Sequence, residues 1–181
     1  MNATALFEDR VTLLDGSMGQ ELIRRGAGDH DLLWAAGALL HQPDVVRQVH
    51  EDYIRAGADI ITTNSYSTIR AKFEPAGLED RFEDMNRLAG KLAAQARDDA
   101  GRDVWVAGSL PPQRGSYRPD RVGPFGEIEP LYREQVGLLA PFVDLFLCET
   151  MSTAEEARAA ATAATQSGKP VWVSWTLEDR L

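Results

Sequence analysis

The stretch PDVVRQVHEDYIRAGADIITTNSY, residues 43–66, decides the fold because it contains a complete transition from helix to strand. Its first half starts with Pro43, places apolar side chains at helical spacing and stops at Gly57, as an amphipathic helix does. Its second half, residues 58–65, is a short apolar run that ends in polar side chains. The stretch therefore predicts a helix followed directly by a buried strand.

The same pattern recurs on both sides of this stretch. Further apolar runs lie near residues 11, 104, 143 and 171, and amphipathic helical patterns cover 79–101 and 153–168. Runs without polar alternation are typical of parallel strands that are covered on both faces. Alternating strands and helices imply right-handed parallel crossovers. We therefore predict an α/β fold in a single domain spanning residues 1–181.

A polar residue ends each of the five apolar runs. Ligands of parallel α/β folds bind beyond the carboxyl ends of the strands, so we expect these residues to converge. Ser109 or Thr176, taken alone, would more simply mark where a strand reaches solvent. The presence of two carboxylates in the set favours a site. The run-end residues are Asp15, Thr63 with Asn64, Ser109, Glu149 and Thr176.

The spacing of these strand ends leaves two architectures open. At this spacing a closed eight-stranded (β/α)8 TIM barrel would need on the order of 100 further residues. The chain is therefore either a complete five-stranded open sheet or about the first five β/α units of a barrel. The closing residues WTLEDRL resemble a strand that enters a loop without a final packed helix, which favours the partial barrel.

Composition excludes several classes of partner. The chain has 19 basic and 28 acidic residues, a net charge of −9, which disfavours binding to nucleic acid and to anionic membranes. We find no apolar run of about 18 residues and no signal-peptide pattern, and we expect a cytoplasmic protein. The lone cysteine, Cys148, is expected in the core.

The segment 110–130 is rich in proline and glycine and predicts a long connection. Such loops are often binding loops or lids. Its side chains Arg114, Tyr117, Arg118 and Arg121 could contact an anionic substrate, or the arginines could simply be solvated.

Several familiar chemistries lack their residues. Gly16 and Gly19 alone do not complete a dinucleotide-binding fingerprint, and the second Asp of a dehalogenase-type phosphatase is missing beside Asp15. The serine hydrolase elbow G-x-S-x-G does not occur. The candidate metal ligands do not have ligand-like spacing. They are His30, His41, His50 and Cys148.

The remaining pair of acids suits an amino-acid ligand. Asp15 and Glu149, at the ends of the first and fourth runs, can bind an ammonium group. Backbone N–H groups at residues 17–19 can bind a carboxylate. Together they describe an amino-acid pocket.

Four parts of the sequence resemble the homocysteine S-methyltransferase family. LLDGSMGQELIRRG (13–26) is similar to the family's opening Asp-Gly-(Gly/Ser)-x-Gly-x-x-Leu element. The segment 33–66 is similar to its Trp, "P…V…H…Y…AGAD" and "TN(T/S)Y" elements, and VAGSLPP (106–112) and LFLCETM (145–151) match later strand ends. The resemblance extends over essentially the whole chain.

This resemblance implies a TIM barrel that transfers a methyl group from a small-molecule donor to the homocysteine thiol, forming methionine. It implies that Asp15, Gly16 and Glu149 hold the amino and carboxylate ends of homocysteine, and that Trp34, Thr63 and Asn64 belong to the binding site. It also implies a zinc ion held by three cysteines, none of which is in this chain. We therefore expect a homocysteine-binding partial barrel that is inactive by itself and forms homo-oligomers through unpaired strand edges. The alternative is a catalytically inactive fragment that serves as an amino-acid-binding or interaction module.

Overall fold

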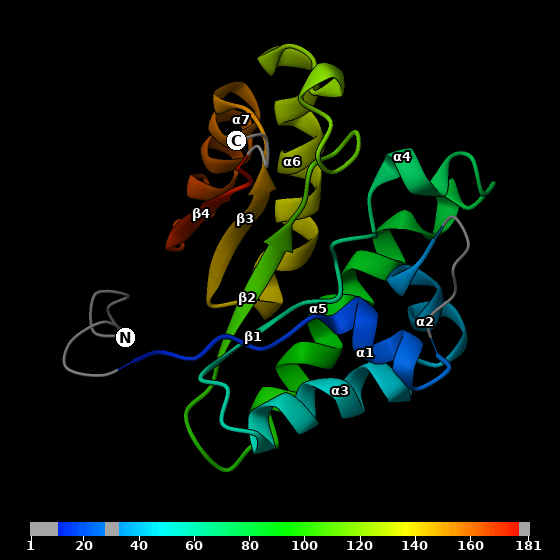
Figure 1. Cartoon of the computed structure of the whole chain (residues 1–181), viewed down its shortest axis with the longest axis vertical. Coiled ribbons are helices and arrows are strands. Elements are labelled where there is room, and N and C mark those ends of the chain that lie inside the picture. Colours follow the sequence, from blue (N-terminus) through cyan, green and yellow to red (C-terminus); the bar gives the residue numbers. More distant parts are fainter. Residues whose placement is uncertain (1–10, 28–32, 178–181) are drawn as a thin grey trace.

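The computed structural model describes residues 11–27 and 33–177 and contains a four-stranded parallel sheet (Figure 1). The strands lie side by side in the order in which they occur in the chain. Register places Thr62 opposite Ala107 and Leu147 opposite Trp172. The strands are β1 (Ile60–Thr62), β2 (Trp105–Leu110), β3 (Leu145–Met151) and β4 (Val171–Trp175).

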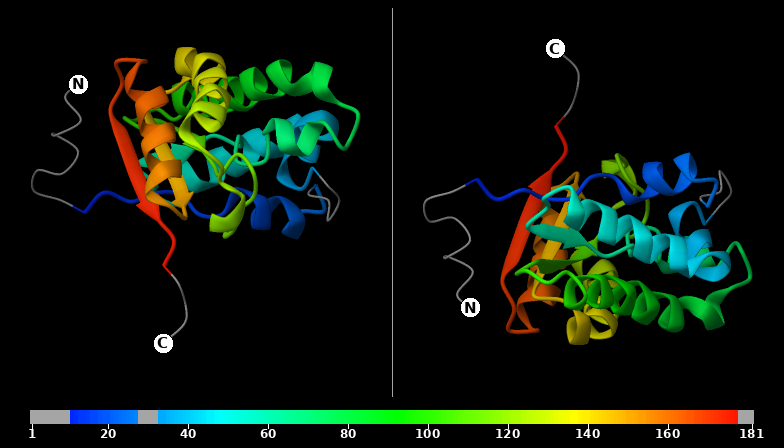
Figure 2. Two further views of the ribbon diagram at one scale, coloured as in Figure 1. Left: turned by 90° about the horizontal axis from the view of Figure 1, so that it is seen from above. Right: turned by 90° about the horizontal axis from the view of Figure 1, so that it is seen from below.

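Helices cover one face of this sheet. The long helices pack against each other in sequence, α3 on α5, α5 on α6 and α6 on α7, so that they form one layer (Figure 2). A doubly wound sheet would place helices on both faces, whereas one helical layer around strands in chain order is the geometry of a TIM barrel. The long helices are α3 (Pro43–Arg55), α5 (Phe82–Asp98), α6 (Phe125–Leu139) and α7 (Ala154–Thr165).

Shorter helical segments complete the fold. They are α1 (Met18–Arg24), α2 (Ala35–His41) and α4 (Arg70–Phe73), with 3-10 turns at Glu79–Arg81, Pro119–Arg121 and Ala140–Phe142. None of the helices in the described ranges is long and apolar enough to cross a membrane.

The helix signals in the sequence correspond to observed contacts. In α3, Pro43 is at the first position, and the buried face includes Val46 and Val49. At the start of α7, the Thr153 hydroxyl accepts a hydrogen bond of 3.1 Å from the Glu156 N–H. The Glu156 carboxylate accepts its return bond of 2.9 Å from the N–H of Ser152 instead of Thr153, so the capping box is shifted by one residue.

The two faces of the sheet have different roles. Outward-facing Ile61, Val106 and Phe146 pack against the helices in the main core. The inward face carries a small apolar cluster of Ile60, Ala107, Leu145 and Leu147, with Trp105 and Trp172 packed against it. Beyond this cluster, toward the carboxyl ends of the strands, the inward face becomes polar.

The first predicted strand is reduced to a single bridge, between Leu14 and Ile60. The Asp15 N–H donates to the carbonyl of Ile60 at 2.9 Å, and the side chain of Leu13 is 51% exposed. At the opposite edge of the sheet, Trp175 of β4 is 54% exposed. Within the described ranges each of these two edges has a neighbouring strand on one side.

The expectation of a long loop at 110–130 is wrong for its last six residues, because α6 already begins at Phe125. Acids close in sequence pair with two of its arginines: Arg114 contacts Glu127 at 2.8 Å, and Arg118 contacts Asp120. These ion pairs are local and hold the segment itself.

Candidate functional site

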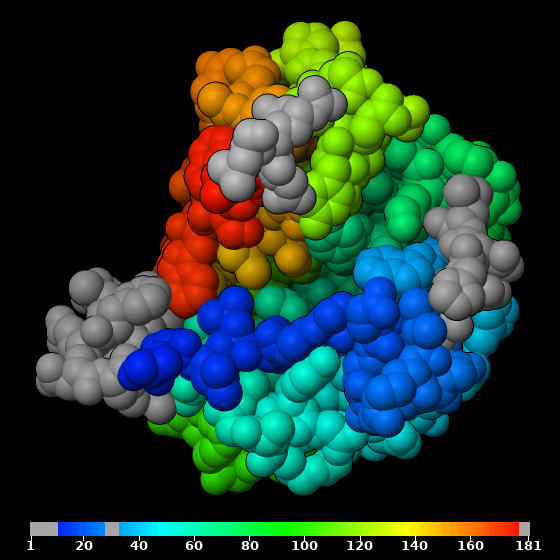
Figure 3. Space-filling model, viewed as in Figure 1, coloured from blue at the N-terminus to red at the C-terminus, as the bar shows by residue number. Residues whose placement is uncertain are grey.

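A cavity of about 590 Å³ lies at the carboxyl ends of the strands, and Figure 3 shows the hollow between the N-terminal segment and the loop that follows β2. All six residues expected in the site line it. They are Asp15, Gly16, Trp34, Thr63, Asn64 and Glu149. Ser109 also lines the cavity, whereas Thr176 does not and instead donates to the Met151 carbonyl.

Asp15 is held by β1. Its carboxylate accepts a bond of 2.8 Å from the Thr62 N–H and one of 3.0 Å from the Thr62 hydroxyl. Burial raises the pKa of Asp15 from 3.8 to about 7, the Thr62 hydrogen bonds oppose this rise, and the nearby charge of Glu149 adds to it. A cation that enters the cavity would therefore favour the ionised form of a carboxyl group that burial otherwise keeps partly protonated near neutral pH.

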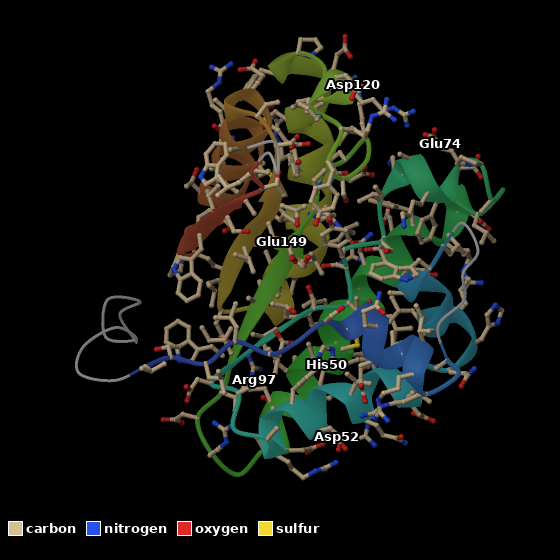
Figure 4. All side chains as sticks on the ribbon, in the orientation of Figure 1. His50, Asp52, Glu74, Arg97, Asp120 and Glu149 are labelled. Atoms are coloured by element: carbon tan, nitrogen blue, oxygen red, sulfur yellow. The ribbon has the colours of Figure 1, made fainter. Side chains whose placement is uncertain are left out.

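Glu149 lies at the centre of the open face in Figure 4. Its carboxylate accepts a hydrogen bond from the Ser109 hydroxyl, and burial raises its pKa, which this bond partly offsets. The position follows from an irregularity in β3: Cys148 faces Val173, but the next pairing joins Met151 to Trp175. The irregularity bends the strand end at the cavity.

Thr63 and Asn64 are 2% exposed each, and their hydrogen bonds hold the cavity wall together. The Thr63 hydroxyl accepts from the Ser109 N–H at 3.0 Å. The Asn64 amide donates to the Ala35 carbonyl at 3.0 Å and ties the start of α2 to the end of β1. Their direct contact with a substrate stays a prediction.

The glycines of the DGSMG loop are needed for close packing. A Cβ on Gly19 would lie 2.4 Å from Cζ2 of Trp34, and one on Gly16 would lie 2.9 Å from the Tyr53 hydroxyl oxygen. Neither distance is possible without displacing an aromatic ring. Gly16 therefore admits the ring of Tyr53, which donates to the Ser17 carbonyl at 3.3 Å, in addition to any role at the ligand.

Backbone strain is concentrated at the cavity. Across the described residues, the non-glycine residues with positive φ are Trp34 (45°), Tyr117 (59°) and Thr150 (65°), and all three line it. Side chains make this region of φ unfavourable, by about 1–3 kcal/mol, so it persists only where surrounding contacts enforce it. Such strain is typical of functional sites.

Sequence reasoning missed several lining residues. Tyr66 meets the Trp34 ring edge-on with centroids 6.5 Å apart and shares a bond of 2.6 Å with the Ser116 hydroxyl. Lys72 of α4 also lines the cavity. Tyr66 could have been found as the last residue of TTNSY, but no pattern in the sequence indicates Lys72.

A buried polar network supports the cavity from below. Gln135 of α6 donates to the Ser65 carbonyl at 3.0 Å and to the Asn86 side chain at 3.2 Å, and it accepts from Gln113 at 2.9 Å. Asn86 in turn accepts from the Thr68 hydroxyl at 2.7 Å. The network joins α5 and α6 to the segments that follow β1 and β2.

Comparison with known proteins identifies the family. The family model described as Homocysteine S-methyltransferase matches residues 12–181. The chain belongs to the homocysteine S-methyltransferase family. A curated homocysteine S-methyltransferase of Escherichia coli K12 is 35% identical over 93% of this chain and 59% of its own length. A selenocysteine methyltransferase of Astragalus bisulcatus is 32% identical over 94% of this chain and 60% of its own length.

Solved structures of the family share this fold. The crystal structure of the homocysteine methyltransferase MmuM from Escherichia coli in its metallated form has a TM-score of 0.85 and 34% identity. The match covers 97% of this chain and 66% of that one. The predicted TIM-barrel class is confirmed, with a partial barrel here. The chain spans about three fifths of the length of these curated family relatives.

The described residues do not fit the metal that the family resemblance implies. No group of three or more His, Cys, Asp or Glu side chains in 11–27 and 33–177 could hold an ion. Cys148 is buried in the main core, where desolvation raises the pKa of its thiol to about 12. His50 is buried inside α3, His41 is exposed at the end of α2, and His30 lies outside the described residues.

Proposed function

We propose that this chain forms the homocysteine-binding part of a homocysteine S-methyltransferase. In this proposal the cavity holds homocysteine while its thiol accepts a methyl group from a small-molecule donor, giving methionine. Membership of the family and the cavity at the strand ends support the proposal. Zinc, the methyl donor and turnover by this chain belong to the proposal as expectations from the resemblance.

The buried carboxyl pair carries the proposal. Asp15 and Glu149 line one cavity, burial raises the pKa of both carboxyl groups, and the charge of Glu149 adds to the cost of ionising Asp15. An ammonium group relieves that repulsion and gains charge-assisted hydrogen bonds. The α-amino group of homocysteine is such a cation, so the pair would bind and orient this end of the substrate.

Calorimetric titration with L-homocysteine tests the proposal. We expect binding by the unmodified chain and a loss of affinity of about 10-fold or more in Asp15→Asn and in Glu149→Gln, since each variant removes one charge partner of the ammonium. Glu74→Gln is the matched control, because Glu74 is exposed and lies away from Glu149 in Figure 4. Its affinity should be unchanged.

Two results would contradict the proposal. The first is no binding of homocysteine by the unmodified chain. The second is equal affinity in all three variants, which would place the ligand elsewhere. A parallel assay of methyl transfer to homocysteine, with zinc and candidate donors supplied, tests the expectation that the chain by itself is inactive. Turnover by this chain would overturn that expectation while leaving the binding proposal intact.

A further inference from the structure

The cavity contains one basic side chain among its described lining residues, Lys72. Lys72 is half-buried in α4 and lies over the ring of Trp34, which lines the same cavity, with Nζ 5.7 Å from the ring centroid. Its ammonium donates a long bond of 3.4 Å to the Ser67 hydroxyl. The ion pairs found within 11–27 and 33–177 leave it without a carboxylate partner, whereas arginines nearby, such as Arg70, have one.

The position of this ammonium is set by a rigid wall. Trp34 is fixed from one side by the close approach of Gly19, and the bond from Asn64 to the Ala35 carbonyl holds the residue that follows it. The strained φ of 45° at Trp34 shows that the surrounding contacts determine this conformation. The ring thus presents a fixed surface to Lys72, which limits where the ammonium can lie.

Burial without an anion is unfavourable for a cation. Desolvation lowers the pKa of Lys72 below its usual value, and no acidic partner offsets the effect. Asp15 and Glu149 line the same cavity, and burial disfavours their negatively charged forms and raises the pKa of each. The cavity therefore has acidic and basic groups that remain unpaired with each other, an arrangement that a zwitterion can satisfy.

We infer that Lys72 binds the carboxylate of a ligand in this cavity. The inference deepens the proposed function and rests on it. The same chemistry can come from two sources: the α-carboxylate of homocysteine, whose ammonium is held by Asp15 and Glu149, or the carboxylate of a methyl donor such as betaine. In both cases the carboxylate accepts a charge-assisted hydrogen bond from Nζ.

The experiment compares ligands that differ in this carboxylate. L-Homocysteine is paired with 3-aminopropane-1-thiol, which lacks it, and glycine betaine is paired with choline. Affinities are measured by calorimetry for the unmodified chain, Lys72→Met, Lys72→Arg and the control Lys91→Met, an exposed lysine on α5. We expect Lys72→Met to weaken one carboxylate ligand by about 10- to 100-fold and the paired ligand without a carboxylate by less than about 3-fold. Lys72→Arg should restore much of the loss.

The two ligand pairs and the variants distinguish the possible outcomes. Loss confined to homocysteine assigns its α-carboxylate, and loss confined to betaine assigns the donor. Homocysteine binding that is equal in the unmodified chain and in Lys72→Met, together with unaltered betaine binding, overturns the inference while the proposed function stands. Equal losses for both members of each pair also overturn it, since they indicate a structural role. Binding of betaine alone, dependent on Lys72, would sustain the inference and contradict the proposed homocysteine site.

Discussion

The carboxylate of Asp15 accepts two hydrogen bonds from Thr62, one from its backbone N–H at 2.8 Å and one from its hydroxyl at 3.0 Å. Asp15 belongs to a segment that pairs with the sheet through one bridge, so Thr62 fixes both the position and the ionisation of this group. The two bonds stabilise the ionised form against burial, which raises the pKa to about 7.

Thr62→Val should therefore move the pH dependence of homocysteine binding. Below a pKa near 7, Asp15 must lose a proton to bind an ammonium, so affinity rises with pH and levels off above it. Removing the hydroxyl bond raises this midpoint by roughly one pH unit, the equivalent of a hydrogen bond to a charged group. Titration calorimetry between pH 5.5 and 8 measures the midpoint. Thr62→Ser keeps the hydroxyl and should keep the midpoint; an unshifted midpoint in Thr62→Val would contradict the role given to this bond.

Most of the fold was predictable from the sequence because local signals and tertiary packing agree. The helix predicted at 43–57 is α3 at Pro43–Arg55, and the runs near 104 and 143 are β2 and β3. The strand expected near 11 is reduced to the single bridge between Leu14 and Ile60, which the apolar run alone does not indicate. The sequence also left open whether helices cover one face of the sheet or both, because contacts such as that between α5 and α6 depend on the two helices together.

The lining residues of the candidate site could be predicted where they lie at strand ends, and could not be predicted where they lie elsewhere. Asp15, Asn64 and Glu149 were found because parallel strands bring their carboxyl ends together. Lys72 and Gln135 lie on helices with no pattern that separates them from solvated or core residues. Their roles depend on contacts with segments distant in sequence, such as that of Lys72 with Trp34 and the bond from Gln135 to the Ser65 carbonyl.

His50 should make the fold acid-sensitive. It is fully buried on α3, neither ring nitrogen has a hydrogen-bond partner among the described residues, and burial lowers its pKa from 6.5 to about 3. The unfolded chain therefore binds a proton that the folded chain does not as pH falls below about 6.5. The free energy of unfolding should decrease from that pH toward about 3, by up to about 1.4 kcal/mol per pH unit, and should not change from this source above it.

Urea unfolding of His50→Leu at pH 7.5, 5.5 and 4.5 measures this effect. The difference in unfolding free energy between the variant and the unmodified chain should grow as pH falls, because leucine has no proton to bind. His41→Gln, at an exposed position, is the control. Its difference in unfolding free energy from the unmodified chain should stay the same at the three pH values. A constant difference for His50→Leu would show that the buried imidazole does not control acid stability.

Gln135→Leu should destabilise the chain strongly. The substitution removes three buried hydrogen bonds, to the Ser65 carbonyl, to Asn86 and from Gln113, while these partners keep other bonds such as that from Gln113 to the Pro111 carbonyl. Each lost bond costs about 0.5–1.5 kcal/mol, so we expect a loss of about 2–4 kcal/mol in chemical unfolding. Gln95→Leu on α5, at an exposed position, is the control and should change stability by far less. Equal stability of the two variants would show that the network contributes little.

The two sheet edges should promote self-association. Trp175 and Val173 on β4 are 54% and 37% exposed, and Leu13 at the opposite edge is 51% exposed. Exposed apolar side chains at the edge of a sheet favour pairing with another chain. Sedimentation velocity at increasing concentration should therefore reveal oligomers. Trp175→Lys should shift the distribution toward monomer, because a charged side chain at a strand edge must be desolvated on pairing.

The control Gln166→Lys adds the same charge at an exposed position after α7 and should leave the distribution unaltered. An unmodified chain that stays monomeric at all concentrations would contradict this expectation. Equal shifts in both variants would attribute the change to net charge and not to the β4 edge.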